Sequence, residues 1–225
     1  MQRPRGYRIC DQCGAVETPS AKFRLCGGCM TTQYCSQDCQ RMHWPSHKPI
    51  CQHTAGQISN IKQSAAAGYS DGELQKCLRK FTSAHTALLG WAGFQALKLK
   101  RTPANIRQSA LLIELTHHNR YPESHRRFSI ARTHVVPRAY VRDPLVISDI
   151  QWREERCRRS GGIGTLVIII QCGAISQVMP VEVDPPSRIS WDTREDWEEV
   201  LHHFVESGRT DFQPISTTPR GIYYG

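Results

Sequence analysis

The hydrophobic pattern of the chain becomes regular only after about residue 69. From Leu74 onward apolar residues recur at helical spacing, which predicts a helix that runs to about Lys100 and ends near Thr102–Pro103. The segment Ser70–Glu73 has the form of a capping box, which is typical of a helix start. The apolar stripe consists of Leu74, Cys77, Leu78, Phe81, Ala84, Leu88 and Leu89, so Cys77 is interpreted as a core residue rather than a metal ligand.

Several short apolar segments beyond this helix predict β-strands. Residues 110–116 are apolar, and residues 128–136 alternate in polarity before Pro137. Residues 165–172 are rich in β-branched side chains, which indicates a buried strand, and residues 177–183 are its expected antiparallel partner across a turn near residues 173–176. Residues 141–150 show neither the helical nor the strand spacing of apolar residues clearly, so their structure is left ambiguous.

A last helix closes the predicted domain. Asp192 is its expected cap and Gly208 its expected stop. Its apolar face comprises Trp197, Val200, Leu201, Phe204 and Val205. The order α-β-β-β-β-α predicts an α+β domain with an N-terminal helix, antiparallel strands and a C-terminal helix.

We divide the chain by these patterns and by composition. Residues 1–53 form one domain, the polar residues 54–69 a linker or weak helix, residues 70–208 the α+β domain, and residues 209–225 a tail expected to be an arm.

Cysteines separate the first domain from the rest. Seven of the ten lie between Cys10 and Cys51, whereas Cys77, Cys157 and Cys172 are scattered. A domain of only 53 residues is rarely stabilised by apolar burial alone and usually needs metal or disulfides. The chain has no secretory signal pattern, and its longest apolar run, residues 163–170, is too short to span a membrane. We therefore expect an intracellular protein, in the nucleus or cytoplasm, where clustered cysteines bind metal.

The spacing of these residues predicts two closed zinc sites. Four ligand pairs follow one another: Cys10 with Cys13, Cys26 with Cys29, Cys35 with Cys39, and His47 with Cys51. A CxxC turn lets two sulfurs converge on one ion, and residues four apart on a helix share a face. Eight protein ligands leave two Zn²⁺ ions no open position, which indicates structural rather than catalytic zinc, so we do not expect an enzyme.

Other readings of the same residues remain open. Seven cysteines would leave one unpaired in a disulfide framework, and His43 or His53 could replace His47 as the eighth ligand. Ser36 can cap a helix from about Gln37 to Trp44, which Pro45 is expected to end.

The segment with the eight ligands, called the finger below, resembles a known family. The string Tyr34–Cys35–Ser36, the residues Cys39–Gln40 and His43–Trp44, and the final His47–Lys48 with Cys51 are similar to the MYND-type zinc finger over residues 10–51. The resemblance implies a cross-brace, in which alternate pairs share an ion. Site one would comprise Cys10, Cys13, Cys35 and Cys39, and site two Cys26, Cys29, His47 and Cys51. Spacing alone leaves sequential sites open.

The resemblance also implies a protein-interaction module, with proline-rich peptides as ligands in several members. Gln40 and Trp44 match the positions that contact peptide, although Trp44 could instead pack on the finger's own core. Gly27 and Gly28 depart from the peptide-binding pattern, because a side chain that could help hold a peptide is absent there.

Charge and the remaining motifs bear on the alternative functions. The formal charge of +9 falls to about +6 if seven thiolates hold two Zn²⁺ ions. A nucleic-acid-associated protein is the main alternative, and a SET-type lysine methyltransferase relative is a more distant one, since its cofactor motifs are missing. We interpret His117–His118 and His202–His203 as surface histidines. The cluster Arg153, Arg156, Arg158 and Arg159 is interpreted as a solvated helix face.

Overall fold

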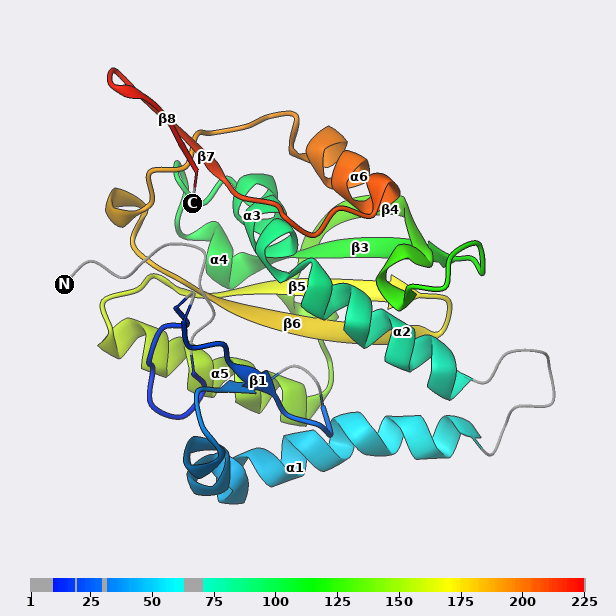
Figure 1. Ribbon diagram of the computed structural model, residues 1–225. Coiled ribbons are helices and arrows are strands. Elements are labelled where there is room, and N and C mark those ends of the chain that lie inside the picture. The colour runs from blue at the N-terminus through cyan, green and yellow to red at the C-terminus, as the bar shows by residue number, and fades with distance from the viewer. Residues whose placement is uncertain (1–9, 19, 30–31, 63–70, 225) are drawn as a thin grey trace. The chain divides into compact units, whose positions relative to one another are not determined.

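The chain divides into two compact units, residues 1–79 and 80–225. The computed structural model, drawn in Figure 1, describes residues 10–18, 20–29, 32–62 and 71–224, and for residues 54–62 and 71 it describes the backbone alone. Helix α2 (Asp71–Ala84) contributes to both units, because the first unit ends within it. Among the described helices, none has the length and apolar character required to cross a lipid bilayer.

The first unit has little regular structure before its long helix. Strands β1 (Arg24–Leu25) and β2 (Gln33–Tyr34) form a short antiparallel pair, and helix α1 extends over Gln37–Lys62. The backbone N–H of Cys39 donates to the Ser36 hydroxyl at 3.1 Å, so the predicted cap is confirmed. The predicted stop at Pro45 is wrong, because α1 continues through both Pro45 and Pro49.

The region between the predicted domains is therefore helical in part. Residues 54–62 continue α1, which favours the weak-helix reading over the linker. Residues 63–69 of the expected linker, and Ser70 of the expected capping box, lie outside the described residues.

The second unit is built around one four-stranded sheet with the strand order β4-β3-β5-β6. Its main elements are α3 (Thr86–Ala96), α4 (Asn105–Gln108), β3 (Ser109–His117), β4 (Phe128–Pro137), α5 (Pro144–Arg159), β5 (Gly164–Cys172), β6 (Ile175–Val183), α6 (Trp197–Ser207), β7 (Ile215–Thr218) and β8 (Gly221–Tyr224). Short 3₁₀ turns occur at Ser124–Arg126, Arg138–Tyr140 and Pro186–Arg188. The four predicted sheet strands are all present. Strands β5 and β6 form the expected antiparallel pair, and β3 and β4 are also antiparallel, while the pairing of β3 with β5 is parallel and departs from the expected antiparallel sheet.

Helices cover both faces of this sheet (Figure 1). Gly93 of α3 comes close to Leu166 and Ile168 of β5, while Ile150 of α5 packs with Val167 and Ile169. Successive residues of a strand point to opposite faces, so α3 and α5 lie on opposite sides. This explains why β5 is buried along almost its whole length and reads as an uninterrupted apolar run.

The long helix predicted for residues 74–100 is wrong, because it is two helices separated at His85. The Thr86 hydroxyl donates to the Thr82 carbonyl at 2.9 Å and to the Ser83 carbonyl at 3.1 Å. Such side-chain bonds compete with the helical ladder. Helix α3 then ends at Ala96, and Lys98 takes a positive φ of 52° in the turn that follows.

The segment that the pattern left ambiguous forms the start of α5. Pro144 is its first residue, and the Asp143 carboxylate accepts the N–H groups of Leu145 at 2.9 Å and Val146 at 3.3 Å. An Asp–Pro pair is a strong helix start, so the sequence carried a signal that the apolar pattern did not.

The helix cap expected near the C-terminus is also wrong. Helix α6 begins after Asp196, and Asp192 instead accepts the N–H and hydroxyl of Thr217 at 2.9 and 2.6 Å. These bonds from Thr217 lower the pKa of Asp192. The residues expected to form an arm contain the hairpin β7–β8. The expected stop at Gly208 is confirmed, with a left-handed φ of 68°.

Candidate metal centre

Site one brings together the first and third ligand pairs. The ligand atoms of Cys10, Cys13, Cys35 and Cys39 all lie within 4.8 Å of one another. The Sγ atoms of Cys13 and Cys35 are 3.6 Å apart, and those of Cys35 and Cys39 are 3.5 Å apart. Cys10 is buried, whereas Cys13 and Cys35 are exposed. The site therefore borders on solvent.

Site two brings together the second and fourth pairs. The ligand atoms of Cys26, Cys29, His47 and Cys51 lie within the same 4.8 Å limit, and all four residues are buried. The Nε2 atom of His47 lies 3.4 Å from the Cys26 sulfur and 3.5 Å from the Cys29 sulfur. The Cys26 and Cys51 sulfurs are 3.6 Å apart. The pairing is therefore interleaved, which excludes the sequential arrangement that spacing alone had left open.

These distances fit tetrahedral zinc. With Zn–S bonds of about 2.3 Å and Zn–N bonds of about 2.0 Å, a regular tetrahedron has S···S edges of roughly 3.8 Å and S···N edges of roughly 3.5 Å. The observed separations of 3.4–3.6 Å are close to these edges. Four sulfurs, or three sulfurs and one imidazole, are also the donor sets that zinc prefers. Two closed sites result, and they would hold the two Zn²⁺ ions as structural ions.

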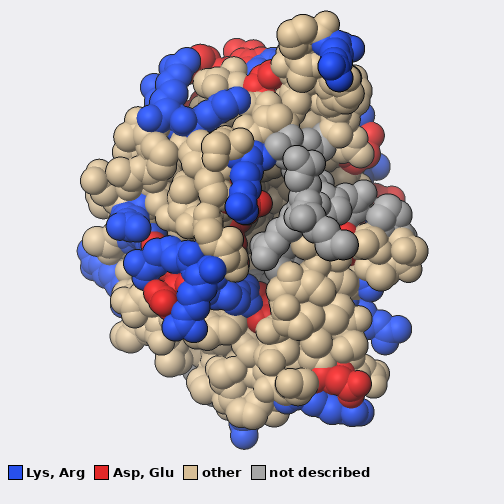
Figure 2. All heavy atoms as spheres, turned by 90° about the vertical axis from the view of Figure 1, so that its left-hand side faces the viewer, with Lys and Arg blue, Asp and Glu red and all other residues tan. Residues whose placement is uncertain are grey.

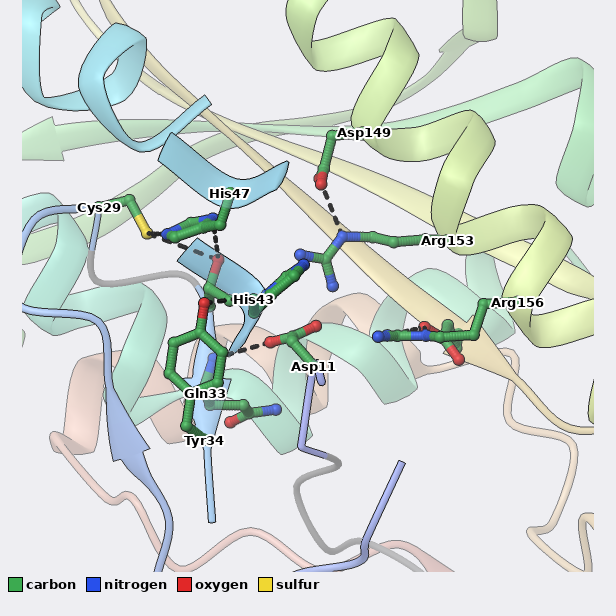
Figure 3. Close-up of polar contacts among 11 residues, drawn as sticks. Asp11, Cys29, Gln33, Tyr34, His43, His47, Asp149, Arg153 and Arg156 are labelled. Atoms are coloured by element: carbon green, nitrogen blue, oxygen red, sulfur yellow. Dashed lines mark hydrogen bonds and ion pairs between the residues drawn. The ribbon is translucent and has the colours of Figure 1, made fainter. Parts of the chain in front are cut away.

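The orientation of His47 is fixed from outside the site. Its Nε2 faces the sulfur of Cys29 (Figure 3). Its Nδ1 lies 3.4 Å from the hydroxyl of the buried Thr32. A metal-bound histidine usually donates its other ring N–H to such an oxygen, which sets the tautomer. Thr32 is a supporting residue that sequence reasoning missed, because a single threonine in a loop carries no distinctive pattern.

His43, the main rival for the eighth ligand position, has a different role. Its Nδ1 lies 3.0 Å from the Tyr34 hydroxyl, and its ring stacks on His47 with the centroids 5.5 Å apart (Figure 3). It lies outside both ligand groups, and so does the other rival, His53. His43 therefore supports the ring of the true ligand instead of replacing it.

The crowding of thiols makes their ionisation interdependent. Burial raises the pKa of Cys13 and Cys51, and burial together with hydrogen bonds to neighbouring thiols raises the pKa of Cys35 to about 12. At Cys10 burial opposes ionisation, but backbone hydrogen bonds lower its pKa to about 7. Zinc must displace the protons that most of these thiols hold, so acid favours release of the metal.

Gly28 makes room for site two. A Cβ atom on Gly28 would lie 2.6 Å from the Cys51 sulfur, which is closer than real Cβ atoms come, whereas one on Gly27 would meet nothing within 4 Å. The absence of a side chain at Gly28, which departs from the peptide-binding pattern, therefore has a steric reason inside the metal site.

Gln40 and Trp44 follow one another on α1, one turn apart. Trp44 has 38 % of its surface exposed, while the finger aromatics Phe23 and Tyr34 are buried. The Trp44 and His47 rings are in an edge-to-face arrangement, with their centroids 6.1 Å apart. Trp44 therefore contacts a zinc ligand and still presents a surface to solvent.

The basic cluster of the second unit is neutralised within its own helix and the adjacent strand. Arg153 pairs with Asp149 at 2.8 Å, Arg156 pairs with Glu182, and Arg158 and Arg159 both pair with Glu155 at 3.0 Å. Figure 2 shows basic and acidic side chains next to each other, with wide areas of other residues between the groups. This arrangement does not favour a phosphate-binding surface.

The histidine pairs differ from one another. His203 is exposed as expected, whereas His117, His118 and His202 are half-buried and so depart from the expected surface position, with His202 beside Glu206. An edge-to-face contact with the Phe128 ring explains part of the burial of His117. Neither pair belongs to a metal-ligand group among the described residues.

Comparisons with known proteins agree with the geometry of the finger. The family model described as MYND finger matches residues 10–51. The MYND-type zinc finger protein samB of Aspergillus clavatus is 39 % identical over 51 residues, which cover 22 % of this chain and 8 % of that protein. This chain thus spans less than a tenth of that relative's length. No solved structure gave a significant match. Residues 10–51 form a MYND finger with two zinc-binding sites, and this family generally mediates protein–protein interaction.

Proposed function

We propose that the finger is a zinc-dependent docking module that takes an extended, proline-rich segment of a partner protein across Gln40 and Trp44. The observation that carries this proposal is the partly exposed Trp44 ring held against the zinc ligand His47. Proline-rich segments are already extended, so ordering them costs little entropy, and an aromatic ring offers the prolines a flat apolar surface.

The arrangement supports a non-enzymatic role for the finger. Both metal sites consist entirely of protein ligands and leave no position for a substrate or an activated water. What zinc supplies here is the orientation of α1, which carries ligands of both sites as well as Gln40 and Trp44. Loss of zinc should therefore abolish docking even though neither ion touches the peptide.

Fluorescence anisotropy with a set of labelled proline-rich peptides tests the proposal. Trp44→Ala should weaken the best-binding peptide by about tenfold or more, because truncating a central aromatic anchor costs on the order of 2 kcal/mol. Met42→Ala is the matched control, because Met42 is an exposed apolar residue two positions earlier on the same helix and points elsewhere. Both variants must retain two zinc ions by native mass spectrometry.

Two outcomes would contradict the proposal. Equal affinity of Trp44→Ala and the unaltered protein would show that Trp44 is structural. Retention on heparin together with a shift of DNA in a gel, without peptide binding, would favour the nucleic-acid alternative.

A further inference from the structure

A buried arginine reaches the backbone of zinc site two from a distant part of the sequence. Arg79 lies in α2 and has only 5 % of its surface exposed. Its Nη1 donates a hydrogen bond of 2.7 Å to the carbonyl oxygen of Gly28, which lies 51 residues earlier. Both residues belong to the first compact unit. Gly28 lies between the ligands Cys26 and Cys29, so Arg79 holds the turn that presents these two sulfurs.

The charge of site two gives this contact a second consequence. Three thiolates and one Zn²⁺ ion carry a net charge of −1, and all four ligand residues are buried. A buried charge without a partner is costly. Arginine keeps its positive charge when buried. Burial lowers the pKa of Arg79, while the negative charges of Cys29, Cys51 and Cys26 act in the opposite direction.

Site one has a different way to stabilise its charge. Its four thiolates and one Zn²⁺ ion carry a net charge of −2, but Cys13 and Cys35 are exposed, so water can solvate the sulfurs. Site two is enclosed and cannot rely on solvent in this way. Site two is therefore the site that needs a fixed positive group nearby.

We propose that Arg79 is the charge partner and backbone clamp of zinc site two, so that this site holds its metal tightly only when α2 is folded. Sequence spacing within residues 10–51 cannot reveal this residue, because it lies outside the finger motif. Arg79 acts through the turn at Gly28 and through its charge, and it is a positioning residue rather than a ligand.

Three variants of one helix test the proposal. Arg79→Met removes both the charge and the hydrogen bond, Arg79→Lys keeps the charge but not the planar donor group, and Lys76→Met is the control, because the Lys76 side chain is 64 % exposed on the same helix. Zinc content is measured by native mass spectrometry, and release is followed as transfer to a chromophoric chelator. Cobalt substitution identifies the site, because four sulfurs and three sulfurs with one nitrogen give different d–d absorption bands.

The expected result is a selective loss. Arg79→Met should release one of two zinc ions roughly 10–100 times faster, because loss of a group that supports a metal ligand usually lowers metal affinity by about that factor. The cobalt bands should assign this ion to the site with three sulfurs and one nitrogen. Arg79→Lys should recover part of the loss, and Lys76→Met should release both ions at the unaltered rates.

Two results would overturn the proposal. The first is release of both ions from Arg79→Met at the unaltered rates. The second is equal acceleration at both sites, which would indicate general destabilisation. If Arg79→Met gives no folded protein, Arg79→Gln replaces it, since it keeps a donor without the charge, and the same two results decide.

Discussion

The two units of this chain are stabilised by different forces. The apolar core of the finger is small and is made largely of the cysteines themselves, with Phe23 and Tyr34 added. The second unit has a sheet whose central strand β5 is apolar on both faces and is covered by α3 on one side and α5 on the other. Metal coordination therefore stabilises the finger, and hydrophobic burial stabilises the second unit. Each unit should unfold under a treatment that leaves the other folded.

Loss of a zinc ligand is the strongest way to test this separation. Cys39→Ser should unfold the finger, because structural zinc contributes on the order of 10 kcal/mol per site. Hydrogen exchange followed by mass spectrometry should show loss of protection within residues 10–53 and unchanged protection in β3 and β5. Cys172→Ala, a buried thiol in the second unit, is the control and should retain two zinc ions. A Cys39→Ser protein with two zinc ions and a protected finger would refute the idea that metal coordination stabilises the finger.

A cavity in the sheet should destabilise the second unit and leave the finger folded. Ile168→Ala removes a fully buried side chain of β5 and should lower the free energy of unfolding of the second unit by about 3 kcal/mol, while zinc content stays at two. Urea denaturation gives the energy, and Val135→Ala on the exposed part of β4 should change it by less than about 1 kcal/mol. Loss of zinc from the Ile168 variant would mean that the finger depends on the sheet.

Acid should weaken the second unit through His85. Burial, with a smaller effect of His125, lowers the pKa of His85 to about 4. Neither of its ring nitrogens has a hydrogen-bond partner among the described residues. Between pH 6.5 and about 4 the unfolded chain binds a proton that the folded unit does not, so stability falls as the pH falls, by up to about 3 kcal/mol.

The measurement is urea denaturation of the second unit at pH 7 and at pH 4.5. His85→Phe should have a shallower pH dependence than the unaltered protein, whereas His203→Gln, at an exposed position, should not. Identical pH profiles of His85→Phe and the unaltered protein would exclude His85 as the source.

The smallest expected effect distinguishes two adjacent glycines of the finger. Gly28→Ala places a methyl group 2.6 Å from the Cys51 sulfur and should weaken zinc binding at site two by about 1–3 kcal/mol. Gly27→Ala meets nothing within 4 Å and should leave both ions in place. Competition with a chelator measures the difference, and equal affinities of the two variants would show that site two can expand.

The sequence predicted the parts of each unit that depend on a single, strong signal. The ligand spacing predicted the seven cysteines and favoured His47 as the eighth ligand while leaving His43 and His53 open, and the apolar run in β5 predicted a buried strand. The family resemblance was needed to choose the interleaved pairing. Thr32 and Arg79 could not be predicted, since their roles arise only when loops and helices come together.

Predictions from local helix-stop and helix-cap signals failed where contacts with residues distant in sequence outweigh those signals. Pro45 should end a helix, yet α1 continues to His47 and Cys51, whose places in site two require the additional turns. In the second unit, Asp192 looks like a helix cap but binds Thr217 of β7. In both cases a partner that is distant in sequence determines the local structure.

The unequal exposure of the two metal sites also determines how the finger meets an oxidant. Hydrogen peroxide in solution reaches Cys13 and Cys35 of site one first, whereas the thiols of site two are shielded. Helix α1 carries Cys39 of site one together with His47 and Cys51 of site two. Oxidative damage therefore begins at the solvent-facing ion, and release of that end of α1 would then expose the second ion to the same chemistry.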